Sequence, residues 1–464
     1  MQNLYKRVIP VEETYRRLRD LMPLVGVTHV FELTALDNLG LPVCVTVGPL
    51  PKEMDRRFLE KQILGASANQ AHIVEKLETV WGSMEIFPVE AGGSAVANAA
   101  PRMAAGKGLA PLDARVSAMM EAVERSSTRQ VSTPVKRASY REISRRAQAV
   151  DPRQLLLISP ASYDDDLILD WVEGWELNGS EPFWVPVETA TFGGDSQDDG
   201  RTFVDTPTGQ GAGNVIEEAI CHGLAEVIEH DAWALSVARQ TLSNAERGLF
   251  ARMFRNDEAL GEQIDEAAFR PLDPAGLDFL AELNGWLGNL EREQGWARIY
   301  DITSDVGVAA ISASLSGIGG SGPDGGGLGA HPDARVALAR ALTESAQQRL
   351  ILGLRARMRS ARGNQAAVEY WHWGDPAPQK AEFQPFARVQ SNALPTIQED
   401  IDHMLSALRV RGFARVIAVD LTKPGLDVPV VKVIAPGMAD YWNSAAPPDW
   451  RMVQRRMQSA QVSY

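Results

Sequence analysis

Glutamates recur at helical spacing in two segments that are otherwise apolar. In the first, RVSAMMEAVERSS, Ser117, Glu121 and Glu124 are separated by four and three residues. At about 100° per residue these side chains fall on one arc of roughly 100°. In the second segment, NVIEEAICHGLAEVIEHDAW, four side chains lie within one arc of roughly 120°: Asn214, Glu218, Glu226 and Glu229. Two helices that each carry a row of carboxylates can hold cations between them.

The residues around these glutamates weigh against a solvated face, which is the usual role of a charge run along a helix. Apolar residues such as Met119, Val123 and Leu224 separate the glutamates, and lysines at i+4 do not. Carboxylates that converge on one cavity repel each other unless cations lie between them. Magnesium is the natural occupant because it favours carboxylate and phosphate oxygens. An iron or manganese carboxylate site is the alternative, but such sites favour Glu-x-x-His pairs, which EVIEH does not provide.

A third predicted helix, ARVALARALTESAQQRLILG, carries polar groups suited to a nucleotide. Arginine can bind phosphate oxygens with two parallel hydrogen bonds, and glutamine can bind a base or a ribose. The segment offers Arg340, Glu344, Gln347 and Arg349. Each of the three predicted helices follows a glycine-containing segment, at 106–108, 208–214 and 317–331. We expect loops there, so that the helix N-termini can face an anion.

Several common catalytic motifs are missing from the sequence. There is no G-x-x-x-x-G-K-[ST] loop, no G-x-S-x-G elbow and no strand–turn–helix unit of the Rossmann type. None of the seven histidines has metal-ligand spacing, and we expect His331 to be a turn or cap residue. The two cysteines, Cys44 and Cys221, are far apart in apolar surroundings and are expected to be structural thiols.

Composition and charge restrict the class of protein further. The chain has 464 residues, 45% of them hydrophobic and 23% charged, as in an ordinary soluble globular protein. Its formal net charge of −14 disfavours nucleic acid as the main partner, because a phosphate-tracking surface normally needs excess Lys and Arg. No signal peptide and no run of about 18 apolar residues is found, so we expect a cytoplasmic protein without a membrane span.

The elements that must position these residues alternate between helix and strand. Helical periodicity predicts helices near 9–22, 111–129, 214–237, 332–358 and 399–411. It also predicts a charged helical segment within 51–80. Strands are predicted at 28–36, 41–47, 184–187, 297–301, 308–315, 413–420 and 428–434, whereas small residues at 91–105 predict a loop. This alternation predicts an α/β or α+β fold.

Taken in order, five blocks of the sequence resemble the YcaO superfamily. They are GVTHVFELTALDNLGLPV (26–43), GKGLAPLDARVSAMMEAVER (106–125), GAGNVIEEAICHGLAEVIEHDAW (211–233), GLGAHPDARVALARALTESAQQR (327–349) and VIAVDLTKPGLDVPVVKVIAPG (416–437). The resemblance implies a YcaO-like ATP-binding fold, with long Glu-bearing helices packed on mixed β-sheets. It divides the chain into an N-terminal helix and strands (1–50), a helical insertion and loop (51–100), a catalytic core (101–440) and a C-terminal tail (441–464).

The resemblance also implies a site for ATP and magnesium. The residues that would bind the nucleotide are Lys107, Ser117, Glu121, Glu124, Asn214, Glu218, Glu226, Glu229, Gln347 and Arg349. The magnesium ligands among them would be Glu121, Glu124, Glu218, Glu226 and Glu229. Three positions depart from the family: His29 and His230 stand where arginine is common, and Met120 where a basic residue is common.

The activity implied by the resemblance is ATP-dependent activation of a peptide backbone amide by O-phosphorylation. The P-x-P-x-P tail typical of azoline-forming members is missing, so we expect thioamidation or a related modification of a ribosomally synthesised peptide. An azoline-forming cyclodehydratase and a non-catalytic nucleotide-binding or regulatory protein are the alternatives. A precursor peptide is the expected substrate, while a TfuA-like or peptide-recognition partner, a homodimer, and the role of the insertion at 51–95 are left open.

Overall fold

The computed structural model describes most of the chain. The described residues are 6–48, 70–87, 103–158, 163–179, 181–193, 200–241, 270–273, 281–317, 324–361 and 383–440. Most of the predicted insertion at 51–95 and the whole tail at 441–464 therefore lie outside the described residues.

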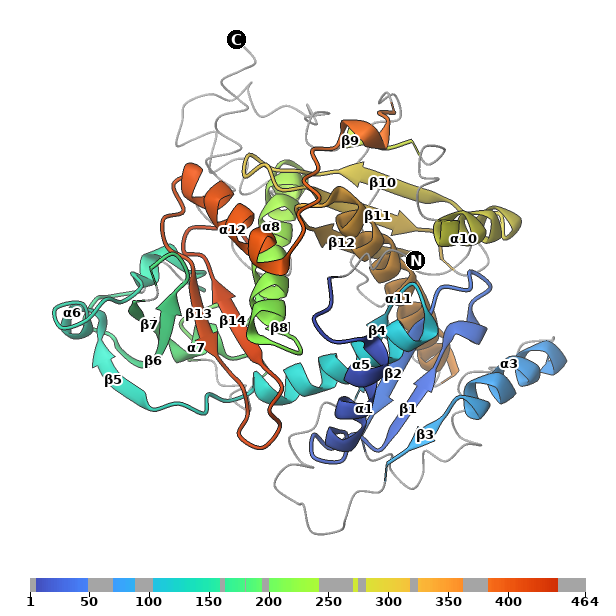
Figure 1. Ribbon diagram of the computed structural model, residues 1–464, viewed down its shortest axis with the longest axis horizontal. Coiled ribbons are helices and arrows are strands. Elements are labelled where there is room, and N and C mark those ends of the chain that lie inside the picture. The colour runs from blue at the N-terminus through green and yellow to red at the C-terminus, as the bar shows by residue number, and fades with distance from the viewer. Residues whose placement is uncertain are drawn as a thin grey trace.

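Three long helices occupy the middle of the molecule, and three β-sheets surround them (Figure 1). These helices are α5 (Pro111–Ser127), α8 (Ile216–Thr241) and α11 (Ala334–Ala361), which confirms the three long helices predicted from the sequence. Pro111 begins α5, where its missing N–H costs no helical hydrogen bond. Asp113 in the first turn and Arg125 in the last complement the helix dipole.

Each of the three helices packs on a different sheet. One sheet has the strand order β3-β1-β2-β4, the second β12-β11-β10-β9, and the third β5-β6-β13-β14-β8 with β7 paired to β6. The strands are β1 (His29–Glu32), β2 (Val43–Val47), β3 (Glu85–Ile86), β4 (Met103–Lys107), β5 (Val135–Ser139), β6 (Ile168–Glu176), β7 (Pro182–Pro186), β8 (Gln210–Ala212), β9 (Arg270–Pro271), β10 (Ala297–Asp301), β11 (Ala310–Leu315), β12 (Gly325–Ala330), β13 (Ile417–Asp420) and β14 (Val430–Ile434). The α/β class is as predicted, although every pair of named strands is antiparallel and not mixed.

Glycine segments that we expected to be loops form strands instead. β12 occupies the end of the expected loop at 317–331, and β4 covers Lys107, which we expected in a turn. The reason is close packing: a Cβ atom added to Gly325, Gly327 or Gly329 would lie 2.0–2.3 Å from a carbonyl oxygen of α11. Gly106 meets the backbone of α5 in the same way, at 2.0 Å from the Ala118 nitrogen. These glycines let each helix lie directly against its strand.

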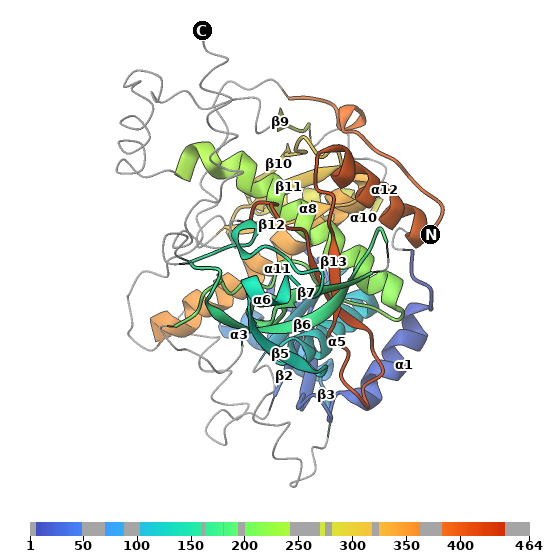
Figure 2. The same cartoon turned by 90° about the vertical axis from the view of Figure 1, so that its left-hand side faces the viewer.

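The remaining helices lie on the outside of this arrangement. They are α1 (Val11–Leu21), α3 (Gln70–Gly82), α6 (Tyr140–Ile143), α7 (Val187–Ala190), α10 (Ala281–Arg292) and α12 (Ile397–Val410), with short 3₁₀ turns η1 (Thr34–Leu36), η2 (Pro152–Gln154) and η7 (Phe386–Arg388). A capping box between Thr396 and Glu399 fixes the start of α12. In the view of Figure 2, strands β5, β6 and β7 lie nearest the viewer, in front of α11.

The apolar core is divided among the sheets and continues between the glutamates of the long helices. Met119 and Val123 of α5 belong to one buried cluster, and Leu224 and Ile228 of α8 belong to another. Apolar faces therefore hold the helices in place while other faces of the same helices remain available for polar groups. Within the described part of the chain, no helix is both long enough and apolar enough to cross a bilayer.

Candidate functional site

Five glutamates from the three central helices form what we call the carboxylate cluster. The cluster consists of Glu121 and Glu124 on α5, Glu226 and Glu229 on α8, and Glu344 on α11. Backbone N–H groups orient two of these side chains: Gly209 donates to Glu226 Oε2 at 3.3 Å, and Ala330 donates to Glu229 Oε2 at 3.0 Å. The glycine-containing strand ends thus hold the carboxylates in place.

The electrostatics of the cluster are those of a site prepared for cations. Burial raises the pKa of Glu124 well above its ordinary value, and the charges of Glu121 and Glu226 raise it further. Burial also raises the pKa of Glu226 to about 7, assisted by Glu229, and raises that of Glu229, assisted by Glu344. A divalent cation would remove the repulsion that causes part of these shifts. The donor set therefore fits magnesium.

Several cationic side chains border the cluster, among them Arg125, whose Nε atom lies 2.6 Å from Glu121 Oε1. Lys107 Nζ forms an ion pair with Glu344 Oε2 at 2.5 Å. Arg340 Nη2 lies 3.7 Å from Glu229 Oε2 and 3.5 Å from His222 Nε2. Lys432 of β14 is 3% exposed, and its charge lowers the pKa of both Glu124 and Glu226. Cations beside carboxylates are the arrangement that a phosphate-bearing ligand with bound metal requires.

Asn214 and Glu218 form a second group, at the start of α8. Glu218 Oε2 accepts hydrogen bonds from Asn214 N at 2.7 Å and from Asn214 Nδ2 at 2.9 Å. Both residues also contact the N-terminal segment, since Val8 N donates to Glu218 Oε1 at 2.7 Å and Thr14 Oγ1 donates to Asn214 Oδ1 at 3.0 Å. Glu218 lies two turns of α8 before Glu226. The predicted nucleotide and magnesium residues are therefore spread over several turns of α8.

The other predicted residues take different positions. Ser117 is half-buried on α5, one turn before Glu121. Gln347 Nε2 donates to Ala105 O of β4 at 3.1 Å, so Gln347 links α11 to the strand that carries Lys107.

Arg349 lies apart from the phosphate role that the resemblance gives it. Its side chain is fully buried, and its terminal nitrogens pair with Asp37 at 3.2 Å and with Glu293 at 2.7 Å. A guanidinium group closed off in this way is not open to a phosphate. Arg349 follows Arg340 by nine residues, which places the two on opposite faces of α11. We therefore replace Arg349 by Arg340 in the candidate site.

His230, where the resemblance leads us to expect arginine, forms part of a polar network. Its Nδ1 atom lies 3.3 Å from Asp440 Oδ1, and its Nε2 atom lies 4.0 Å from Glu226 Oε1. Although burial opposes the charge, the hydrogen bond and charge of Asp440 raise the pKa of His230 to about 9. A protonated His230 thus supplies a positive charge beside Glu226, as an arginine would.

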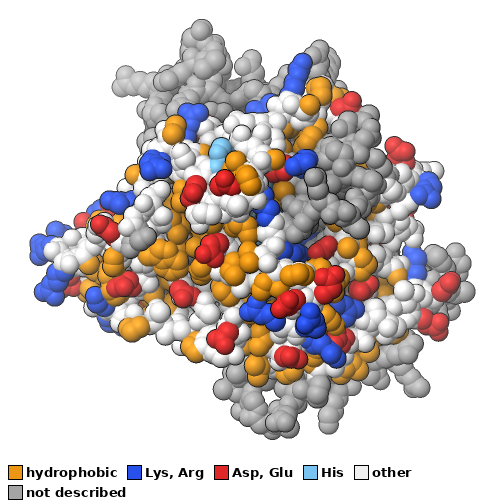
Figure 3. All heavy atoms as spheres, in the orientation of Figure 1, with side chains coloured by type: hydrophobic (Ala, Val, Ile, Leu, Met, Phe, Trp, Pro, Cys, Tyr) orange, Lys and Arg blue, Asp and Glu red, His pale blue; other side chains and the backbone are white. Residues whose placement is uncertain are grey.

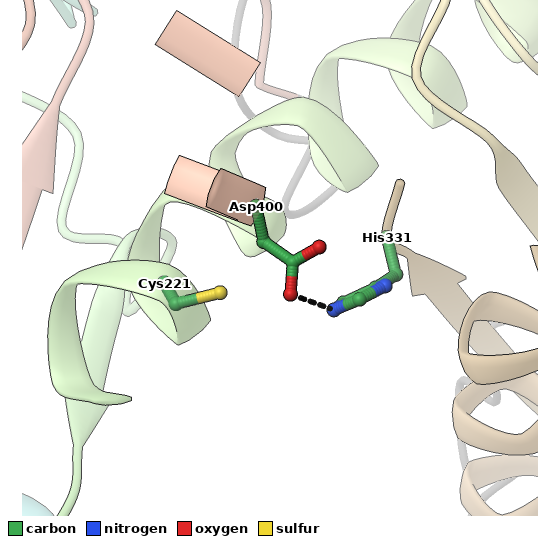
Figure 4. A group of neighbouring side chains, drawn as sticks. All are labelled: Cys221, His331 and Asp400. Carbon is green, nitrogen blue, oxygen red and sulfur yellow. Dashed lines mark ion pairs between the residues drawn. The ribbon is translucent and has the colours of Figure 1, made fainter. Parts of the chain in front are cut away.

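Cys221, His331 and Asp400 form a smaller group whose ligand atoms all lie within 4.8 Å of one another (Figure 4). His331 Nδ1 accepts the N–H of Asp333 at 3.0 Å, so Nε2 carries the proton of the neutral ring and faces Asp400 Oδ2 at 3.6 Å. A metal ion at Nε2 would need a lone pair on that nitrogen, but the nitrogen carries a proton here. Because Lys6 also pairs with Asp400, we interpret the group as a hydrogen-bonded turn, in agreement with the predicted turn role of His331.

Sequence reasoning did not assign Lys432, Asp440 or His222 to the site. Lys432 had a detectable signal, because it is the one charged residue in the apolar strand VPVVKVI. His222 also had one, because it lies four residues from both Glu218 and Glu226 and therefore on the same side of the helix. Asp440 had none, since an isolated Asp in a loop is common. On the face drawn in Figure 3, basic and acidic side chains are interspersed without a continuous basic stripe.

The YcaO family model, described as "YcaO cyclodehydratase, ATP- and Mg²⁺-binding", matches residues 105–439. The chain belongs to the YcaO family. The predicted family, fold class and cofactors, ATP and magnesium, are thereby confirmed. The matched region includes all three central helices and the whole carboxylate cluster.

Relatives extend over nearly the whole chain. An uncharacterised protein of Methanothermobacter thermautotrophicus is 28% identical over 94% of this chain and 95% of its own length. A Rhizobium leguminosarum bv. trifolii protein, described as lying in the tfuA 3′ region, is 26% identical over 94% of this chain and 90% of its own length.

Solved structures share the fold at lower sequence identity. YcaO from Methanopyrus kandleri, bound with AMPPCP and Mg²⁺, aligns with a TM-score of 0.61 and 23% identity over 95% of both chains. A heterocyclase in complex with substrate and cofactor aligns with a TM-score of 0.67 and 18% identity. That alignment covers 95% of this chain, which spans about half of the heterocyclase (54%).

Proposed function

We propose that this YcaO protein uses ATP and magnesium to phosphorylate a backbone amide oxygen of a peptide, and that the product is a thioamide. The observation that carries the proposal is the carboxylate cluster. Glutamates from three helices converge there, and burial and mutual repulsion raise the pKa of three of them. Such a cluster is suited to hold cations together with a phosphate-bearing ligand.

The proposed roles follow the positions of the side chains. Magnesium ligands would come from Glu121, Glu124, Glu218, Glu226 and Glu229. Lys107 and Arg340 would bind phosphate oxygens, and Ser117, Asn214 and Gln347 would complete the nucleotide contacts. Bound magnesium would neutralise charge on the transferring phosphoryl group.

The reaction needs no oxidant or reductant. The amide oxygen attacks the terminal phosphorus of ATP, and the bond from that phosphorus to ADP breaks. Hydrosulfide then adds to the amide carbon, and the carbon–oxygen bond breaks as phosphate leaves. The sulfur replaces the oxygen, and the proton of hydrosulfide ends on the phosphate. Phosphorylation is useful because it turns a poor leaving group into a good one.

Thioamide formation is our first candidate because the N-terminal segment EETYRRLRDLMPLVGVTHV resembles family members that work beside a TfuA-like partner or alone. The Rhizobium relative from the tfuA 3′ region adds support, and we propose a TfuA-like protein as partner. The family description as cyclodehydratase favours the azoline as second candidate.

Mass spectrometry of a precursor peptide encoded beside this gene and co-expressed with this protein tests the product. A gain of about 16 Da, from exchange of oxygen for sulfur, is expected. A loss of about 18 Da would identify an azoline and overturn the thioamide.

ADP release tests the class of protein. We expect magnesium-dependent release in the presence of the peptide and the TfuA-like protein, and its loss in Glu229→Gln. No release under any combination would leave a non-catalytic nucleotide-binding protein. Stoichiometric bound iron would contradict the magnesium site.

A further inference from the structure

Strand β5 forms a free edge of its sheet. One side of β5 pairs with β6 along its whole length, Val135 to Ser139, and no described strand pairs with the other side. Val135, Lys136 and Arg137 are all exposed, and β5 lies at the outer rim in the view of Figure 1. About half of the N–H and C=O groups of an edge strand point away from its partner. β5 therefore offers backbone donors and acceptors to a further strand.

Exposed apolar side chains lie at both ends of the pairing between β5 and β6. Val135 begins β5 and is 44% exposed. Ile168 begins β6 opposite Ser139 and is 49% exposed, and Leu167 just before it is also exposed. Grouped apolar side chains beside an unpaired edge favour an interaction surface over an ordinary solvated strand.

Two basic side chains of β5 have no carboxylate partner, in a chain whose formal net charge is −14. Lys136 Nζ lies 3.8 Å from the centre of the Trp184 ring, and Arg137 lies opposite Asp170 of β6. Within the described part of the chain, neither Lys136 nor Arg137 forms an ion pair. Lys and Arg side chains gather at the end of the molecule where Figure 1 places α6 and β5 (Figure 3). Both cations are therefore available to carboxylates of a partner.

The charges on β5 select the strand that can add to it. Lys136 and Arg137 are neighbours on the strand, so their side chains point to opposite faces of the sheet. A strand that pairs with both needs two adjacent acidic residues. A second copy of β5 fails this requirement, because antiparallel pairing centred on Lys136 or Arg137 brings like charges together. Positive charge on an edge strand hinders pairing in general, and an acidic segment is the kind that it attracts.

We propose that the free edge of β5 binds an extended segment of the precursor peptide, with two adjacent acidic residues opposite Lys136 and Arg137. This inference rests on the proposed function, in which the substrate is a peptide. Main-chain hydrogen bonds would hold the segment and tolerate many sequences, while Lys136 and Arg137 supply the preference for acidic residues. β5 carries no member of the carboxylate cluster, so one part of the peptide is anchored while another is modified.

Fluorescence polarisation of a labelled peptide, Thr-Val-Glu-Glu-Val-Thr, tests the proposal with the full chain and without nucleotide; its length is about that of a usual strand. One control peptide has lysine in place of both glutamates. A second has proline in place of both valines, and therefore lacks two backbone donors. The wild type should bind both controls about tenfold more weakly than the acidic peptide.

Charge reversal on β5 tests the two side chains. Lys136→Glu and Arg137→Glu should each bind the acidic peptide about tenfold more weakly than the wild type does, and the lysine peptide more tightly. Arg409→Glu, which reverses an exposed arginine on α12, is the matched control and should bind as the wild type does. Circular dichroism shows whether each variant is folded.

Equal binding of the acidic peptide by the wild type and Arg137→Glu would overturn the proposal, as would no binding to the wild type. A wild-type dimer that Arg137→Glu dissociates, seen by analytical ultracentrifugation, would assign the edge to a second copy instead. ADP release separates this inference from the proposed function: both β5 variants should keep the wild-type rate at saturating precursor peptide but show a higher KM. No ADP release by the wild type would refute the proposed function, whereas peptide binding at β5 is measured without ATP.

Discussion

Two groups of buried charge lie on opposite faces of α11. Arg340 and Glu344 face the carboxylate cluster, whereas Arg349 faces Asp37 and Glu293. In the second group one guanidinium pairs with two carboxylates, and the arginine is fully buried. In the first, five glutamates from three helices lie together, and Glu226 remains 21% exposed.

This difference distinguishes charged groups that hold the fold together from charged groups that can bind a ligand. The Arg349 group is compensated inside the protein, so it joins α11 to the loop after η1 and to the end of α10. The carboxylate cluster is compensated only in part, and burial, together with repulsion from neighbouring glutamates, raises the pKa values of Glu124, Glu226 and Glu229. A cluster of this kind is costly for the folded state unless a ligand binds it. The following experiments test that contrast.

Removal of Arg349 should have the largest effect on stability. Arg349→Met leaves Asp37 and Glu293 buried without their partner, which we expect to lower the free energy of unfolding by about 3–5 kcal/mol. Urea denaturation measures it. Arg355→Met, which removes an exposed arginine from the same helix, should change stability by less than about 1 kcal/mol. Similar losses in the two variants would contradict a structural role for Arg349.

Neutralising one member of the carboxylate cluster should affect turnover instead. Glu226→Gln should lower ATP turnover by about 100-fold or more, because a proposed magnesium ligand is lost. Its thermal midpoint should be unchanged or higher, because like-charge repulsion falls. Glu217→Gln, an exposed position on the same helix, should keep wild-type turnover. Full activity in Glu226→Gln would exclude Glu226 from the site.

Magnesium should stabilise the wild type through the carboxylate cluster. At 100 times its dissociation constant, bound magnesium adds about 2.7 kcal/mol to the free energy of unfolding. EDTA should reverse this gain in stability. Magnesium should stabilise Glu226→Gln less than the wild type, and Glu217→Gln as much as the wild type. Equal stabilisation of Glu226→Gln and the wild type would place the ion elsewhere.

The pH dependence of the metal-free protein should show the smallest effect. Glu226 has a pKa of about 7 when folded, above the value of about 4.3 in an unfolded chain. The folded state therefore binds an extra proton between these values, and stability from Glu226 increases as pH falls below 7, by up to about 1.4 kcal/mol per pH unit. Denaturation in EDTA at pH 7.5 and 5.5 should show Glu226→Gln as more stable at the higher pH, with the gap closing at the lower. An equal difference in stability between Glu226→Gln and the wild type at both pH values would refute the raised pKa of Glu226.

The sequence predicted the long helices, and the shared helix faces of Glu121, Glu124, Glu226 and Glu229, because helical periodicity depends only on neighbours along the chain. Glu344, which lies with them in the structure, was not among the predicted site residues. The sequence predicted Arg349 less well, although the nine-residue spacing from Arg340 already placed the two arginines on opposite faces. Lys432 and Asp440 were not assigned, because their proximity to α8 depends on how β14 and the segment after it pack against that helix. The glycines of β12 were mistaken for a loop, because glycine normally disfavours a strand unless another backbone approaches closely.

That close approach has a consequence for how the site can change. Because Gly106, Gly327 and their counterparts leave no room for a side chain, main-chain atoms set the distance between each helix and its strand. The spacing of the glutamates is then fixed by rigid backbone and hardly depends on which apolar residues fill the core. The apolar residues between the helices can therefore change while the spacing of the proposed metal ligands stays constant. An alanine in place of such a glycine would push the helix away from its strand, and the glutamates on that helix would move with it.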